Sequence, residues 1–203
     1  MKKALVITGG YLNFDRIDFS SHNFDIIVAA DSGYVAAEKL GLLPDIIVGD
    51  FDSAKFPEID TEIVAVPAEK DDTDTMLACN IAMNRGADNI LILGGTGGRA
   101  DHFLSNIFLL EVFKDKGVST SLFDGENRIT ILKDESTVVK NTNGYFSLFA
   151  LPDCILTLEN CKYPLENYPL TRQNPSFAVS NEVVGDSALI TVTGKAILCE
   201  SKK

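Results

Sequence analysis

The first half of the chain alternates short apolar runs with stretches of helical character. The apolar runs contain few polar residues, which is typical of parallel strands buried on both faces. Alternation of such strands with helices predicts an α/β domain that ends near residues 123–125. The expected strands are 4–7, 25–30, 45–48, 62–66 and 90–93, and the expected helices are 34–40, 73–84 and 101–114.

The pattern changes in the second half of the chain. Short β-rich runs follow one another at close spacing, with turn residues between them and no convincing helix. This arrangement favours an antiparallel sandwich or a barrel-like unit. The runs are 128–132, 145–149, 155–158, 189–192 and 196–198.

Composition narrows the classes of partner. The chain has 203 residues and a formal net charge of -11, which argues against nucleic acid and anionic membranes as partners. Its four scattered cysteines and two histidines argue against a zinc site. Neither a signal-peptide pattern nor an apolar run near the ~20 residues of a membrane span is present, so we expect a cytoplasmic protein.

Two short acidic runs, 49–53 and 70–74, carry the most informative chemistry. Asp50 and Asp52 follow the expected strand 45–48, and residues two apart in an extended chain project to the same side. Two like charges about 4 Å apart repel by about 4 kcal/mol at an effective dielectric constant of about 20, so the pair calls for a cation. Magnesium is the natural candidate. A solvated turn is the alternative, since Asp and Ser are common turn formers.

The second acidic run opens an expected helix. Asp72 is a plausible N-cap, and the helix dipole stabilises carboxylates in a first turn. That explanation covers only one or two of the aspartates. We therefore expect Asp74 to be a further metal ligand, Lys70 to contact phosphate and Thr73 to donate to a phosphate oxygen.

A glycine-rich segment, 94–98, joins the expected strand 90–93 to a helix. Glycines let backbone N–H groups approach phosphate closely, and a helix N-terminus adds favourable partial charge. Arg99 strengthens this interpretation, although a salt bridge to Asp101 is an equally good explanation for it. His102 taken alone is more typical of a structural residue. Further residues that directly follow expected strands, and would line the same edge, are Gly9, Gly10, Asp31 and Ser32.

In order and spacing, these segments closely resemble the thiamine pyrophosphokinase family. The matching segments are 30–33, 44–53, 70–74 and 94–102 in the first half, and 162–165 and 180–182 in the second. The resemblance implies an N-terminal Rossmann-like parallel-sheet domain, residues 1–125, that binds ATP and metal. It implies a C-terminal antiparallel β-sandwich domain, residues 126–203, that contributes thiamine binding and dimer contacts.

The resemblance also implies a reaction and a set of roles. The family transfers the pyrophosphoryl group of ATP to the thiamine hydroxyl with Mg²⁺, forming thiamine diphosphate and AMP, and works as a homodimer with thiamine held where the subunits meet. The implied metal ligands are Asp50, Asp52 and Asp74, and these act in catalysis with Asp31, Arg99 and Asp101. The implied ATP contacts are Gly9, Gly10, Asp31, Ser32, Lys70, Thr73, Arg99 and His102. The implied thiamine contacts are Asp101, Ser180 and Asn181.

The chain departs from the family in one respect and leaves rival functions open. Eukaryotic relatives place a tryptophan against thiamine, whereas this chain has none, so Tyr163 or Phe177 is the expected stacking residue. A pyrophosphokinase acting on another hydroxymethyl heterocycle, such as a pterin, would use the same ATP site. A haloacid-dehalogenase-like phosphatase also carries Asp-x-Asp, but normally after its first strand. A non-catalytic ATP or thiamine sensor would need fewer of the acidic residues.

Overall fold

The computed structural model describes residues 1–20, 22–50, 61–67, 69 and 71–203. Within these residues the chain has a mixed α/β fold with ten strands. Contacts divide it into two compact units, Met1–Gly125 and Glu126–Lys203. In the described part of the chain, none of the helices is both long and apolar enough to cross a bilayer.

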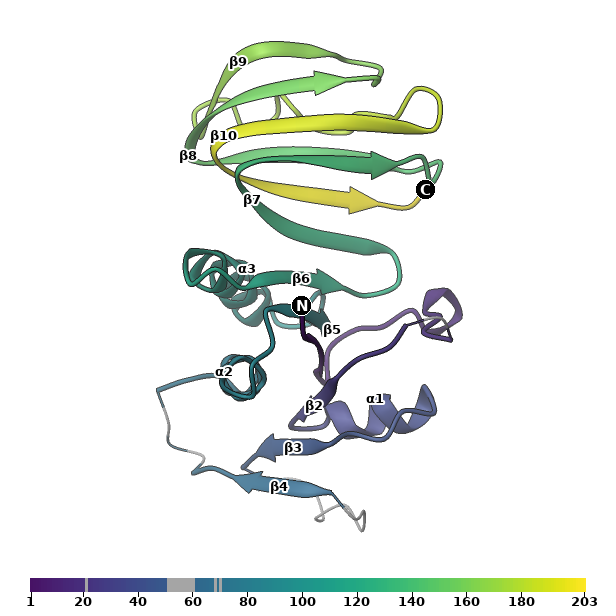
Figure 1. Ribbon diagram of the computed structural model, residues 1–203, viewed down its shortest axis with the longest axis vertical. Coiled ribbons are helices and arrows are strands. Elements are labelled where there is room, and N and C mark those ends of the chain that lie inside the picture. The colour runs from purple at the N-terminus through teal and green to yellow at the C-terminus, as the bar shows by residue number, and fades with distance from the viewer. Residues whose placement is uncertain (21, 51–60, 68, 70) are drawn as a thin grey trace. The chain divides into compact units, whose positions relative to one another are not determined.

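The first unit is built on a parallel sheet with the strand order β4-β3-β2-β1-β5-β6 (Figure 1). The middle strands are buried on both faces, as their nearly continuous apolar sequences predict. The strands are β1 (Lys3–Ile7), β2 (Ile26–Ala30), β3 (Ile46–Gly49), β4 (Glu62–Ala65), β5 (Asn89–Leu93) and β6 (Ser119–Phe123). The helices are α1 (Gly33–Lys39), α2 (Asp74–Asn84) and α3 (Ala100–Asp115), with a short 3-10 turn at Phe14–Arg16.

The strand order places a crevice between β1 and β5. From β1 the chain moves outward through β2, β3 and β4, and then returns to the other side of β1 with β5. Connections leaving β1 and β5 therefore turn in opposite directions along the sheet. In open parallel sheets, ligands bind beyond the carboxyl ends of the strands at such a switch point. The first unit thus has one preferred edge for a binding site.

The predicted elements of this unit are confirmed with small shifts at their ends. β6 was not predicted, because Ser119, Thr120 and Ser121 interrupt its apolar pattern. The N-cap of α2 was also assigned wrongly to Asp72. Thr73 is the N-cap, since its backbone is extended and its Oγ1 accepts a 3.2 Å hydrogen bond from the Met76 N–H.

The second unit contains four antiparallel strands in the order β7-β10-β8-β9. Runs that the sequence analysis separated at Pro152 and Gly194 are single strands here. Register shifts between Val192 and Lys195, and between Gly194 and Ala196, interrupt the pairing without ending the strand. The short β9 was missed. The strands are β7 (Asn127–Lys140), β8 (Tyr145–Glu159), β9 (Leu165–Thr171) and β10 (Ser187–Ser201).

β8 and β10 alternate buried residues with more exposed ones along most of their length. Leu148 and Leu156 lie in different halves of β8, and Ile190 and Leu198 in different halves of β10, yet all four belong to one buried cluster. Both halves of β8 and of β10 therefore contribute to a single core. The predicted antiparallel character of the second half is confirmed.

Candidate active site

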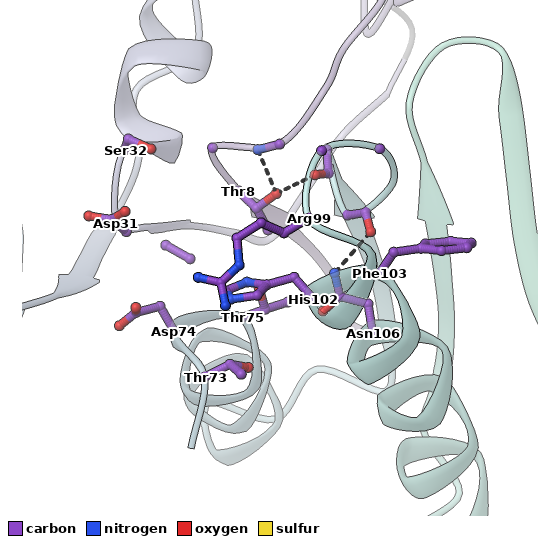
Figure 2. Close-up of a pocket in the computed structure, with 17 residues that line it drawn as sticks. Thr8, Asp31, Ser32, Thr73, Asp74, Thr75, Arg99, His102, Phe103 and Asn106 are labelled. Atoms are coloured by element: carbon purple, nitrogen blue, oxygen red, sulfur yellow. Dashed lines mark hydrogen bonds between the residues drawn. The ribbon is translucent and has the colours of Figure 1, made fainter. Parts of the chain in front are cut away.

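A cleft of about 340 Å³ opens where the carboxyl ends of β1, β2 and β5 meet the N-terminal ends of α2 and α3 (Figure 2). It lies at the switch point that the strand order defines. Many residues that the sequence analysis selected come together here, from four separate segments of the chain. Those that line the cleft are Gly9, Gly10, Asp31, Ser32, Thr73, Asp74, Arg99 and His102.

Close backbone contact shapes the floor of the cleft. A Cβ atom placed on Gly10 would lie 1.7 Å from the carbonyl oxygen of Gly94. Gly94 itself has φ +84, a conformation that favours glycine. The two loops that follow β1 and β5 can therefore meet only because both positions lack a side chain.

Asp31 and Asp50 follow neighbouring strands, β2 and β3. The Asp31 N–H donates a 2.7 Å hydrogen bond to the Val48 carbonyl, so pairing continues one residue beyond β2. Asp31 adopts φ 49, which aspartate tolerates better than most residues. Asp50 is half-buried beside this turn but does not line the cleft. Asp52, its predicted companion, lies outside the described residues.

Asp74 provides a carboxylate at the N-terminus of α2. Its Oδ1 is buried, in a position where the helix dipole favours negative charge. An oxygen donor of this kind, with Asp31 lining the same cleft, fits a hard divalent cation. Among the described side chains, no three acidic, His or Cys groups form a ready-made metal site, and neither Asp52 nor Lys70 is among them. The residues present fit part of a magnesium site.

Arg99 and Asp101 form the salt bridge that the sequence analysis kept as an alternative. The Arg99 side chain donates through Nε to Oδ1 at 3.1 Å and through a terminal nitrogen to Oδ2 at 2.6 Å. These bonds lower the pKa of Asp101 from 3.8 to about 2. Both side chains are largely exposed. Arg99 still lines the cleft, and Figure 2 shows its guanidinium directed into it, whereas Asp101 does not line it.

The second unit holds Ser180 and Asn181. Ser180 is exposed, has φ 59, and donates its N–H to Ser147 Oγ at 3.0 Å. Asn181 is buried: its Oδ1 accepts from the N–H groups of Tyr163 and Glu182, and its Nδ2 donates to the Tyr163 carbonyl at 2.9 Å. The amide of Asn181 is thus used to fix the loop that carries Tyr163.

Two exposed aromatic rings border a small cavity beside Asn181. Phe177 stacks on Tyr168 with ring centroids 4.1 Å apart and remains half exposed, as does Tyr163. Both rings line a cavity of about 220 Å³ together with Asn181. This is the part of the second unit where a flat apolar ring would find contacts.

Two polar residues of the cleft were not predicted from the sequence. Thr8 and Asn106 line it, and both are buried. Thr8 directly follows the expected strand 4–7. This position could have marked Thr8 as a candidate, as it did Gly9 and Gly10. Asn106 lies within a largely apolar helix, 103–113, and nothing in the local pattern marks its side chain as part of a binding site.

Comparison with known proteins identifies the family. A family model described as the catalytic domain of thiamin pyrophosphokinase matches residues 20–122, and one described as its vitamin B1 binding domain matches residues 126–197. The chain belongs to the thiamin pyrophosphokinase family. The resemblance found in the motifs is confirmed, and the two matched regions meet near the division at Gly125.

Individual relatives agree with this membership. Thiamine pyrophosphokinase from Bacillus subtilis is 34% identical over 196 residues, covering 91% of each chain. Its crystal structure superposes with a TM-score of 0.87 over 100% of both chains, at 27% identity. A thiamin pyrophosphokinase family protein from Enterococcus faecalis gives a TM-score of 0.83 and 31% identity over 100% of both chains. The whole chain therefore shares the fold of this family.

Proposed function

We propose that this chain is a magnesium-dependent thiamine pyrophosphokinase. The observation that carries the proposal is the cleft itself, which combines a glycine loop, Arg99 and Asp74 at the switch point of the sheet. Family membership in both halves supports thiamine over a pterin as acceptor, since the second half matches a vitamin B1 binding domain. We expect the enzyme to act in the cytoplasm, where its co-substrate ATP is abundant.

In this proposal the first unit holds the nucleotide. The backbone of the Gly94–Gly98 loop and the guanidinium of Arg99 meet the phosphates, since both offer donors to negative oxygen. Bound Mg²⁺ would offset phosphate charge, held by Asp74 with Asp50 and Asp52. The remaining proposed ATP contacts are Gly9, Gly10, Asp31, Ser32, Lys70, Thr73 and His102.

In the proposed transfer, one phosphorus–oxygen bond forms and one breaks. The thiamine hydroxyl oxygen forms a bond to the β-phosphorus of ATP, and the hydroxyl proton is released to solvent. The bond between the β-phosphorus and the oxygen that bridges to the α-phosphorus breaks, and AMP departs with that electron pair. Because such transition states are stabilised mainly by positioning and charge, the contribution of Arg99 is to meet negative charge as it develops. Asp31 and Asp101 act near the reacting groups.

In this proposal the second unit binds thiamine. We propose that Ser180 contacts thiamine and that Asn181 acts by fixing the Tyr163 loop, because the Asn181 amide is already bonded on both sides. The exposed face of Phe177 or of Tyr163 would take the place of the missing tryptophan. The second unit is proposed to be a two-layered β-sandwich, which is supported by the single buried cluster that joins both halves of its long strands.

We further propose a homodimer with thiamine bound between subunits. Leu104, Phe108 and Val112 are 55%, 58% and 41% exposed and recur every four residues along α3, which gives this helix an apolar outer stripe. Such a stripe suits contact with a second copy. Thiamine affinity that falls as the dimer dissociates is the expected result. Full affinity in a proven monomer would contradict the shared site.

Product analysis tests the proposed reaction directly. The protein is incubated with ATP, Mg²⁺ and thiamine, and the nucleotides and thiamine esters are separated by chromatography. AMP and thiamine diphosphate in equal amounts are expected. AMP formed with a hydroxymethylpterin but not with thiamine would favour the pterin enzyme. ADP or free phosphate would indicate another transfer, and no thiamine-dependent AMP would refute the proposal.

A further inference from the structure

Buried polar side chains in the first unit converge on the Gly94–Gly98 loop. Among its described residues, the buried polar side chains are those of Thr8, Thr96, Asn106, Thr120 and Asp124. Thr8 and Asn106 donate to carbonyl oxygens of this loop. Thr96 belongs to the loop and donates to Asp124. Thr120 is the exception. Burying a polar group costs free energy unless it is hydrogen-bonded, so this concentration in one place calls for an explanation.

The bonds fix three consecutive residues of the loop from three different elements. Thr8, just after β1, donates its hydroxyl to the Gly94 carbonyl at 2.7 Å. Asn106 of α3 donates its amide to the Gly95 carbonyl at 2.9 Å, as Figure 2 shows. Thr96 donates its hydroxyl to the Asp124 carboxylate, just after β6.

Without such bonds the loop would have many conformations. Gly94, Gly97 and Gly98 all have positive φ, at +84, +72 and +66, and glycine enters this region as readily as its mirror image. When a ligand binds only one conformation of a loop, its apparent affinity is proportional to the fraction of molecules that already have that conformation. The buried bonds raise that fraction before the ligand arrives. They also occupy the carbonyl oxygens of Gly94 and Gly95 with donors, which reduces their repulsion of a phosphate.

We propose that Thr96, Asn106 and Asp124 are positioning residues that preorganise the loop for the phosphates of the nucleotide. This inference rests on the proposed ATP site. Thr96 and Asp124 do not line the cleft, so their effect on a ligand must pass through the loop. That separation makes the pair suitable for a test.

The test compares two buried threonines of the same unit. Thr96→Val removes the hydroxyl that bonds Asp124, while Thr120→Val removes a hydroxyl that donates to the Leu110 carbonyl at 3.4 Å, outside the cleft lining. Calorimetric titration with a non-hydrolysable ATP analogue and Mg²⁺ gives affinity and stoichiometry separately. An unfolded fraction lowers the stoichiometry and leaves the affinity of the folded molecules unchanged.

We expect Thr96→Val to weaken nucleotide binding about tenfold, the effect of losing one hydrogen bond to a charged group. The KM for ATP should rise by a similar factor, with a smaller change in kcat and in the KM for thiamine. Thr120→Val should bind within about twofold of the wild type, and Thr96→Ser should restore most of the lost affinity. Asp124→Asn, which keeps the side-chain volume but brings two new donors into a buried site, should also weaken binding.

Specific results would overturn the inference. Wild-type affinity in folded Thr96→Val would show that the loop does not need this bond. Equal losses in Thr96→Val and Thr120→Val would show a general effect of destabilisation. If Thr96→Val does not fold, the nucleotide affinity of folded Asp124→Asn is measured instead, and wild-type affinity in that variant would overturn the inference. A wild-type protein that binds no nucleotide would refute the proposed function as well, whereas normal binding that is unaffected by the variants would refute this inference alone.

Discussion

Gly98 and Gly41 provide a matched pair for testing whether the glycine loop receives phosphate. Gly98 has φ +66 and Gly41 has φ +67, and a Cβ atom on either would meet nothing within 4 Å. Gly98 lines the cleft, whereas Gly41 follows α1 at the surface. Alanine at either position therefore introduces the same backbone strain, but only one of the two methyl groups enters the cleft.

The expected cost to stability follows from the backbone alone. A left-handed conformation costs an L-residue about 1–2 kcal/mol, and the lower entropy of alanine in the unfolded chain offsets about 0.4–1 kcal/mol of this. Gly98→Ala and Gly41→Ala should each lose about 1 kcal/mol of unfolding free energy. For a chain of this size that corresponds to a fall of about 2–4 °C in the melting temperature, measured by circular dichroism.

The expected effect on binding separates the two variants. A methyl group at Gly98 would stand where a phosphate approaches the backbone, so the affinity for an ATP analogue should fall about tenfold or more in calorimetry. Gly41→Ala should bind as the wild type does. Wild-type affinity in folded Gly98→Ala would refute phosphate contact at this residue, and unequal melting temperatures would refute the strain argument.

Three further predictions concern the charged and buried polar groups. Asp74→Asn should reduce thiamine diphosphate formation by about 100-fold or more, while exposed Asp72→Asn in the same acidic run should keep nearly full activity; equal activities would remove Asp74 from the metal site. Because Arg99 lowers the pKa of Asp101 from 3.8 to about 2, the stabilisation from this pair should be present above pH ~4 and lost as pH falls through about 2. Arg99→Gln should return the carboxyl midpoint toward 3.8 in an NMR titration, and an unchanged midpoint would contradict the pairing. Asn181→Ala should lower the melting temperature by about 5 °C, because part-buried backbone groups of the Tyr163 loop lose their partner; an unchanged melting temperature would contradict that role.

The strands and helices of the first unit were predictable because local periodicity matches burial there. β1, β3 and β5 are short apolar runs that lie between turn residues, so the strands expected from these runs match the observed ones. The pattern failed at β6, where Thr120 is buried despite its hydroxyl. It failed again at Gly194, where a bulge interrupts pairing inside a continuous strand. In both cases pairing with a neighbouring strand decides the conformation. The local sequence carries no information about that partner strand.

The site was predictable to the extent that its residues follow strand ends. Asp31, Asp74 and Arg99 were selected from position and residue type, and the structure brings all three to one cleft. Asp124 was not selected, because β6, the strand that it follows, was not predicted and an Asp-Gly pair is typical of a turn. Only packing shows that it is buried and bonded to Thr96.

The sequence by itself determined the family, the order of the elements and most of the chemistry of the cleft. These follow from residue type, spacing and period, which are local properties of the chain. The tertiary structure decided which residues meet: the approach of Gly10 to Gly94, the use of the Asn181 amide within its own unit, and the buried bonds behind the glycine loop. Such contacts join segments far apart in the chain, and their energies depend on distance and burial, which exist only after folding.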